Sequence, residues 1–105
     1  MRITVKMLKE LGACDSGVKA FEKFLNGRKY VLPTQRNLQL AADAGLNVGW
    51  LIYKTKLTVE GITAYGAQEW YQNGLLHRGG GPAVIYADGR KVWYENGAYI
   101  RSERP

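Results

Sequence analysis

Few of the residues that usually carry out catalysis occur in this chain, and they form no recognisable set. His77 is the single histidine and Cys14 the single cysteine. The C-terminal part of the chain contains a repeat of 23 residues, in which Ile100 occupies the position that corresponds to His77. That position therefore accepts an apolar side chain, and we interpret His77 as a packing or rim residue rather than a metal ligand or base. Cys14 has no histidine near it in the sequence, so we expect a small, buried, unreactive side chain.

Glycine and arginine supply the other chemical candidates. Residues 79–81 are three glycines, but no Gly-Lys-Ser/Thr follows them, so a phosphate cradle is not indicated. Arg78 and Arg101 each lie eight residues after a tryptophan, Trp70 and Trp93. Across a tight hairpin these positions are nearly opposite, and a guanidinium stacked on an indole stabilises by about 0.5–1 kcal/mol. No carboxylate pair, triad or cofactor fingerprint is present, so we predict no enzyme, no cofactor and no metal.

A repeat organises the C-terminal part of the chain. Residues 70–78 read WYQNGLLHR, and residues 93–101 return as WYENGAYIR, 23 residues later. A period of this length indicates stacked units of supersecondary structure. Short Val/Ile/Trp/Tyr-rich runs alternate with dipeptides that tolerate positive φ, which predicts antiparallel hairpins with Trp70 and Trp93 in equivalent, largely buried places. The turn dipeptides are Asn73–Gly74, Asp88–Gly89 and Asn96–Gly97.

These residues resemble the MORN family of hairpin repeats. The pattern W-Y-x-N-G-x-x-H-R-x-x-G-P-A, which begins at Trp70, is similar to a MORN-like variant in small bacteriophage and prophage proteins. The resemblance covers about residues 60–105, and the second copy lacks the histidine. It implies a non-catalytic scaffold that makes protein or membrane contacts. For a phage protein, inhibition of a bacterial defence system is one concrete function that it implies.

Positive charge is concentrated at the N-terminal end. Residues 1–36 contain eight Lys and Arg against three acids, whereas residues 61–105 contain five against four. A basic surface favours nucleic acid or an acidic protein as a partner, although it can also serve solubility alone. Six side chains are the predicted partner-binding set: Lys6, Lys9, Lys19, Lys23, Arg28 and Lys29.

Helix signals precede the hairpins. Thr4, Asp15 and Thr34 are expected N-caps of three helices, the second of which carries an apolar stripe of Val18, Phe21, Phe24 and Leu25. Residues 38–56 also have a spacing that resembles a helix-turn-helix, with Gly45 at the turn. In that alternative the chain reads DNA with Asn47, Lys54 and Lys56.

The second helix of this helix-turn-helix alternative is strongly apolar, which argues against a role in reading DNA. Trp50 and Leu51 belong to its bulky run, which offers few contacts to base edges, and Gly49 disfavours a helix there. We therefore expect Trp50 and Leu51 to be buried against the hairpins.

Length and composition bound the remaining choices. With 105 residues and a single cysteine, we predict one α+β domain, 1–105, in a reducing cytoplasm. Short helices in 1–56 would pack on a β-meander in 60–105. No run of about 18 apolar residues predicts a membrane span, and no secretory signal is recognised. We expect a small protein-binding protein; the alternatives are a DNA-binding regulator and an antitoxin-like partner. The sequence leaves the partner and the oligomeric state open.

Overall fold

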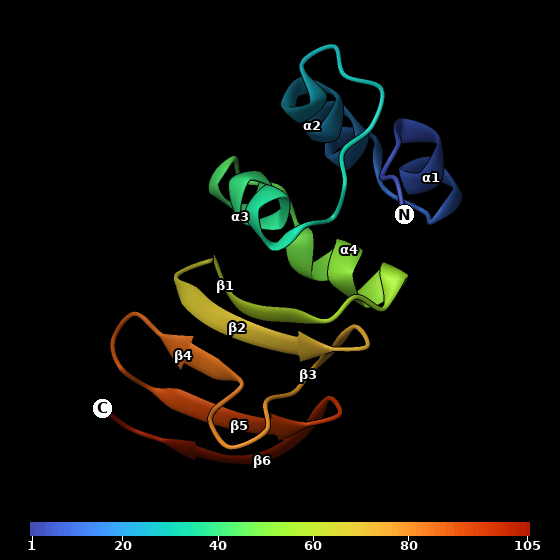
Figure 1. Cartoon of the computed structure of the whole chain (residues 1–105). Coiled ribbons are helices and arrows are strands. Elements are labelled where there is room, and N and C mark those ends of the chain that lie inside the picture. The colour runs from blue at the N-terminus through green and yellow to red at the C-terminus, as the bar shows by residue number, and fades with distance from the viewer. The chain divides into compact units, whose positions relative to one another are not determined.

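The computed structural model describes all of residues 1–105 and has the expected α+β composition. Four short helices precede an antiparallel sheet in the chain (Figure 1). The chain divides into two compact units, Met1–Val48 and Gly49–Pro105. Residues 49–56, which were expected in the helical part, belong to the unit that contains the sheet. None of the helices is long and apolar enough to cross a membrane.

Three helices and one β-bridge make up the first unit. They are α1 (Val5–Glu10), α2 (Asp15–Leu25) and α3 (Gln35–Asp43). Threonine caps α1 and α3 as expected, because Thr4 Oγ1 accepts the Met7 N–H at 3.0 Å and Thr34 Oγ1 accepts the Asn37 N–H at 3.1 Å. The N-cap of α2 is one residue earlier than expected, at Cys14, and Asp15 is the first helical residue.

Apolar residues at helical spacing form the core of this unit. Val18, Phe21 and Leu25 of α2 are buried, while Phe24, at the margin of the predicted stripe, is partly exposed. A two-way backbone bridge joins Ile3 to Val31, and both side chains are buried. The loop after α2 is thereby tied to the N-terminal segment.

The turn at Gly45 ends α3 in the way its sequence predicts. Gly45 has φ +88°, and its N–H donates to the Ala42 carbonyl while the Leu46 N–H donates to the Ala41 carbonyl. These two bonds are those of a glycine-terminated helix end. Helix α4 (Val48–Thr55) follows directly.

The second unit contains a six-stranded sheet. Its strands are β1 (Val59–Ala64), β2 (Ala67–Gln72), β3 (Leu75–Leu76), β4 (Val84–Tyr86), β5 (Lys91–Glu95) and β6 (Ala98–Glu103). The spatial order is β1-β2-β4-β5-β6, all antiparallel, and the short β3 also pairs with β2. Strands β1 and β6 therefore form the two edges, and the sheet is the predicted meander (Figure 1).

Most of the turns follow the local signals of the sequence. Both residues of Asn73–Gly74 and of Asn96–Gly97 have positive φ, as a two-residue hairpin requires. At Asp88–Gly89 only the glycine does, because Tyr86 pairs with Arg90 and three residues form the loop. The hairpin between β1 and β2 turns at Tyr65–Gly66, both with positive φ. The sequence does not predict this turn, because tyrosine is not a turn residue by type.

The two copies of the repeat agree up to the arginine and then diverge. In the first copy the chain leaves the sheet after β3 and returns as β4, where Val84 pairs with Glu69. In the second copy β6 continues past Arg101, and Ser102 pairs with Val92. Residues 79–82 are consequently a loop, while residues 102 and 103 are strand, although the sequence places them in register.

Candidate functional site: the tryptophan–arginine pairs and the cavities beside them

Each repeat holds one arginine against one tryptophan. The Arg78 guanidinium carbon lies 3.9 Å from the Trp70 ring centroid, and that of Arg101 lies 3.8 Å from the Trp93 ring centroid. The stacking predicted from the eight-residue spacing is thus confirmed in both copies. Both indoles are partly exposed, so they are equivalent but less buried than expected.

The first pair is enclosed more completely than the second. A Cβ atom on Gly81 would lie 3.1 Å from the Arg78 guanidinium carbon, so this glycine packs directly on the arginine. Arg78 also donates to the Pro82 carbonyl at 3.2 Å. Arg101 has no such glycine cover, and its partner besides Trp93 is the exposed carboxylate of Glu103. The glycine loop therefore has a packing role at Arg78.

Two cavities lie beside these pairs and repeat with the sequence. One, of about 520 Å³, is lined by Trp70, Tyr71 and Gln72 with Thr58 and Glu60. The other, of about 330 Å³, is lined by Trp93, Tyr94 and Glu95 with Ile100. Both use the same triplet of repeat positions, an indole followed by a phenol and then a polar side chain.

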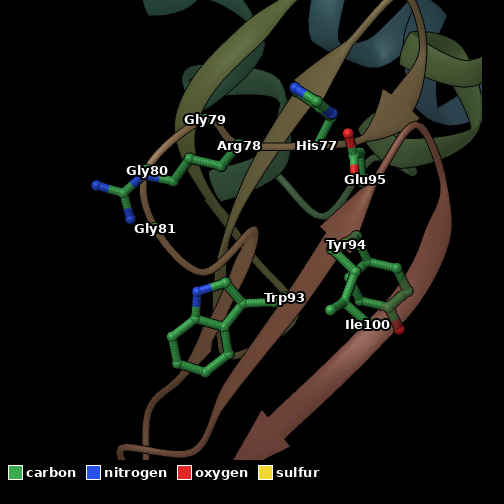
Figure 2. A pocket seen from close by; sticks show the side chains of 9 residues that line it. All are labelled: His77, Arg78, Gly79, Gly80, Gly81, Trp93, Tyr94, Glu95 and Ile100. Carbon is green, nitrogen blue, oxygen red and sulfur yellow. The ribbon is translucent and has the colours of Figure 1, made fainter.

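A shared wall connects the two cavities. His77, Arg78 and Gly79 line both of them, and Gly80 and Gly81 extend the wall over the second. Figure 2 shows that the lining of the second cavity comes from the 77–81 segment, from β5 and from β6. The arrangement offers neighbouring recesses of mixed character, with aromatic surface, a cation and a carboxylate in each. Such recesses suit binding of a chain segment.

His77 has a definite structural partner. Its Nδ1 accepts a hydrogen bond of 3.0 Å from the Asn96 backbone N–H. This bond supports the interpretation of His77 as a packing residue. No group of three or more His, Cys, Asp and Glu residues could hold a metal ion.

Strand β2 also carries a partly buried carboxyl, that of Glu69. Glu69 lies opposite Ile62 and Val84 in the two neighbouring strands. Burial raises the pKa of the Glu69 carboxyl, and a hydrogen bond from the Tyr71 side chain lowers it by less. Burial and then the nearby Glu69 charge raise the pKa of Tyr71. The sequence does not mark this carboxyl as a candidate, because a single Glu in a strand carries no signal.

The predicted partner-binding set lies in the first unit, and every member is exposed: Lys6, Lys9, Lys19, Lys23, Arg28 and Lys29. Arg28 differs from the others, because it donates to the Leu25 carbonyl at 2.8 Å and to the Phe24 carbonyl at 2.9 Å. It thus caps the C-terminal end of α2. Lys6 lies 3.9 Å from Glu10. Four lysines of this set form no ion pair, and their charge is available to solvent: Lys9, Lys19, Lys23 and Lys29.

The alternative DNA-binding set is exposed as well, since Asn47, Lys54 and Lys56 all face solvent. Lys54 is 5.9 Å from the Trp50 ring centroid on the same helix. The expected burial of this helix is correct in kind but wrong in its residues. Ile52 is fully buried, whereas Trp50 and Leu51 are only partly buried.

Cys14 contradicts its expectation. It is exposed at the start of α2 rather than buried. A hydrogen bond with the Ser16 side chain, 3.3 Å away, is the main cause that lowers the pKa of this thiol. The prediction failed because cysteine burial is a statistical tendency, and the position before a helix is usually at the surface.

Comparison of the chain with protein-family models, with curated proteins and with solved structures finds no match.

Proposed function

We propose that this chain is a non-catalytic protein-binding module and that the sheet of its second unit is the contact surface. The observation that carries the proposal is the pair of neighbouring cavities that recurs with the repeat and shares one wall. Aromatic residues and arginine are enriched where proteins bind one another, because they bury large area and also donate hydrogen bonds. On this sheet Trp70, Arg78 and Trp93 supply both the large side-chain area and the hydrogen-bond donors.

The occupant that suits this surface is an extended segment of a partner protein. Each cavity places a carboxylate, Glu60 or Glu95, near a shared arginine. Side chains two residues apart on an extended segment point the same way and could enter neighbouring recesses. The resemblance to MORN-like repeats of phage and prophage proteins favours a host protein as partner, and inhibition of a defence complex is the concrete form of this proposal. An antitoxin-like role would use the same protein contact.

A capture experiment with charge-reversed variants tests the proposal. Tagged protein is used to capture partners from a bacterial lysate, with and without nuclease. Glu60→Lys and Glu95→Lys change the cavity linings at exposed positions. Glu10→Lys and Glu22→Lys make the same charge change at exposed positions of the first unit and serve as matched controls.

The expected result is one protein partner whose capture resists nuclease, falls at least tenfold with the cavity variants and is unchanged with the controls. Equal capture by all four variants would exclude the sheet as the contact surface. Loss of capture on nuclease treatment would favour the DNA-binding alternative, for which the exposed Asn47, Lys54 and Lys56 are the candidate contacts.

A further inference from the structure

Both Asn–Gly turns of the sheet are covered by the chain segment before them. At the first turn, the Gly74 N–H donates to the Leu57 carbonyl at 2.8 Å, and the Asn73 N–H donates to Thr58 Oγ1 at 3.2 Å. At the second turn, the Gly97 N–H donates to the Leu76 carbonyl at 2.8 Å. The Asn96 N–H donates to Nδ1 of the His77 imidazole at 3.0 Å.

These two contacts follow one rule. In each, a residue supplies its backbone carbonyl to the glycine, and the next residue supplies a side-chain acceptor to the asparagine. The fit is close, since a Cβ on Gly74 would lie 2.9 Å from the Tyr53 carbonyl oxygen, and one on Gly97 would lie 3.4 Å from the Leu75 side chain. The sheet thus contains two examples of a surface that receives a glycine turn.

A third surface of the same kind is uncovered. The receiving residues of the second contact, Leu75 to His77, correspond in the repeat to Ala98, Tyr99 and Ile100. These lie in the edge strand β6, and the side chains of Tyr99 and Ile100 are 61% and 53% exposed. In an antiparallel pair, the backbone N–H and C=O groups of successive residues alternate between facing the partner strand and facing away from it. The Leu76 carbonyl faces away from β2 and accepts the Gly97 N–H. Tyr99 occupies the equivalent position in β6, so its carbonyl is placed to accept a turn N–H in the same manner.

We propose that the outer edge of β6 at Tyr99 and Ile100 binds a β-hairpin of a partner protein, one whose two-residue turn has glycine in second place. The turn N–H of that glycine donates to the Tyr99 carbonyl, and Ile100 supplies an apolar contact where His77 supplies an acceptor. This inference rests on the proposed protein-binding function and states which structural element the partner contributes.

Two observations select this occupant over others. Both Asn–Gly turns of the chain are already bound internally. The other two-residue turn with glycine in second place, Tyr65–Gly66, carries a bulky tyrosine where the two received turns carry asparagine, so a second copy has no matching turn to offer. The register of β5 with β6 shifts between Trp93 and Tyr94, which leaves one extra residue in β6. A bulge of this kind interrupts an edge and discourages long strand-to-strand pairing. The extra residue is Ile100, and Tyr99 keeps the pairing beside its turn that Leu76 has beside the first turn, so a compact turn can still make its short contact at Tyr99.

A stapled hairpin peptide is the probe that tests the proposal. It carries the sequence of residues 91–103, KVWYENGAYIRSE, with its ends joined by an added disulfide. A second peptide has sarcosine at the glycine of the turn, which removes the donor N–H and retains the freedom to adopt positive φ. Binding to the intact ¹⁵N-labelled protein is followed through its amide resonances.

The expected result is a saturable shift confined to the amides around Tyr99 and Ile100, with at least tenfold weaker binding of the sarcosine peptide. Ile100→His restores the acceptor that His77 supplies in the first copy and should strengthen binding about threefold to tenfold. Leu40→His is the matched control, since Leu40 is 46% exposed and lies in the first unit.

Three outcomes would overturn the inference: equal binding of the two peptides, no gain with Ile100→His, or shifts located elsewhere on the sheet. Dimers of the free protein that disappear with Ile100→Asp would assign this edge to a second copy instead. The peptide measurement does not depend on the lysate partner. Failure of the cavity variants to affect capture, together with a positive peptide result, would therefore reject the cavity surface and keep the turn-receiving edge.

Discussion

His77 and Asn96 are joined by a hydrogen bond although they lie nineteen residues apart, and this bond connects the first repeat to the second. The N–H of Asn96 belongs to a turn whose neighbouring glycine is bound by the Leu76 carbonyl. One segment therefore satisfies two successive backbone donors of the next hairpin. The histidine of the first repeat is explained by this contact.

Replacement of His77 should consequently weaken the junction of the two repeats. We expect His77→Ile to lower the free energy of unfolding by about 0.5–1.5 kcal/mol, because one exposed backbone N–H loses its protein acceptor and returns to water. Urea unfolding measures the change. The reciprocal substitution Ile100→His should leave stability within about 0.5 kcal/mol. A larger effect of Ile100→His than of His77→Ile would contradict this assignment.

The two turn glycines provide a matched comparison of backbone strain with close packing. Gly74 and Gly97 both have φ +81°, so alanine suffers the same left-handed strain at either position, about 1–2 kcal/mol. Their surroundings differ. A Cβ at Gly74 meets backbone atoms of Tyr53, Ile52 and Lys56 at 2.9–3.0 Å, whereas one at Gly97 meets the mobile end of the Leu75 side chain at 3.4 Å and beyond.

Gly74→Ala should accordingly destabilise by about 1–3 kcal/mol more than Gly97→Ala, since rigid backbone cannot make room as a side chain can. Thermal unfolding of the two variants beside the parent protein measures the difference. Similar melting temperatures for both variants would show that α4 does not pack on the first turn as described.

The arginine pairs predict a second asymmetry. Arg78 is held between Trp70 and Gly81 and donates to the Pro82 carbonyl, while Arg101 has a solvent-exposed acid as its additional partner. Arg78→Ala should cost about 1–2 kcal/mol, the sum of a stacking interaction and a hydrogen bond. Arg101→Ala should cost about 0.5–1 kcal/mol, because exposed ion pairs contribute little. Equal losses in denaturant titration would contradict the structural difference between the copies.

Much of this architecture can be predicted from local sequence. Threonine caps, the glycine at residue 45 and the two Asn–Gly turns act through their own backbone or through residues three or four positions away, so their type alone is informative. The stacking of Arg78 on Trp70 is also a short-range relationship, because the hairpin turn fixes which residues face each other.

The remaining features depend on partners distant in sequence. Thr58 and His77 receive turns that lie 15 and 19 residues away, and no local pattern indicates those contacts. The different course of the chain after each arginine arises because Gly79 to Pro82 cannot continue a strand, whereas residues 102 and 103 can. The loop of residues 79–81 forms part of the wall of the second cavity, so that part of the candidate site could not be predicted from the repeat alone.

Glu69 should give the protein an unusual pH dependence. Its pKa in the folded protein is raised above the ordinary value of 4.5 by burial, so the folded state binds the proton more tightly than the unfolded state. Stability from this group is therefore full at low pH and decreases as pH rises from about 4.5 through the folded pKa. Glu69→Gln should raise the melting temperature at pH 7 and remove this difference near pH 4.

Asp88→Asn is the control with the opposite sign. A backbone hydrogen bond from Arg90 is the largest cause that lowers the pKa of Asp88, so its contribution is present at neutral pH and is lost as the carboxylate is protonated. If Glu69→Gln melts below the parent protein at pH 7, the carboxylate is stabilised in the fold and the assigned direction is wrong.

Nucleic-acid binding by the basic set of the first unit can be tested through its dependence on salt. If this surface binds nucleic acid, affinity must fall steeply with salt, because each neutralised phosphate releases counterions. Lys19→Glu combined with Lys23→Glu should then weaken binding to a DNA duplex and reduce the slope of its salt dependence by about one for each lysine. Both side chains are exposed, so stability should change by no more than about 0.5 kcal/mol. Arg28 is unsuitable for this test, since its substitution would also remove two hydrogen bonds to carbonyls at the end of α2. Lys54→Ala with Lys56→Ala is the parallel variant for the helix-turn-helix alternative.

We expect neither pair of substitutions to change capture of the protein partner, because that contact is assigned to the sheet. Loss of capture with Lys19→Glu and Lys23→Glu alone would place the interface on the first unit.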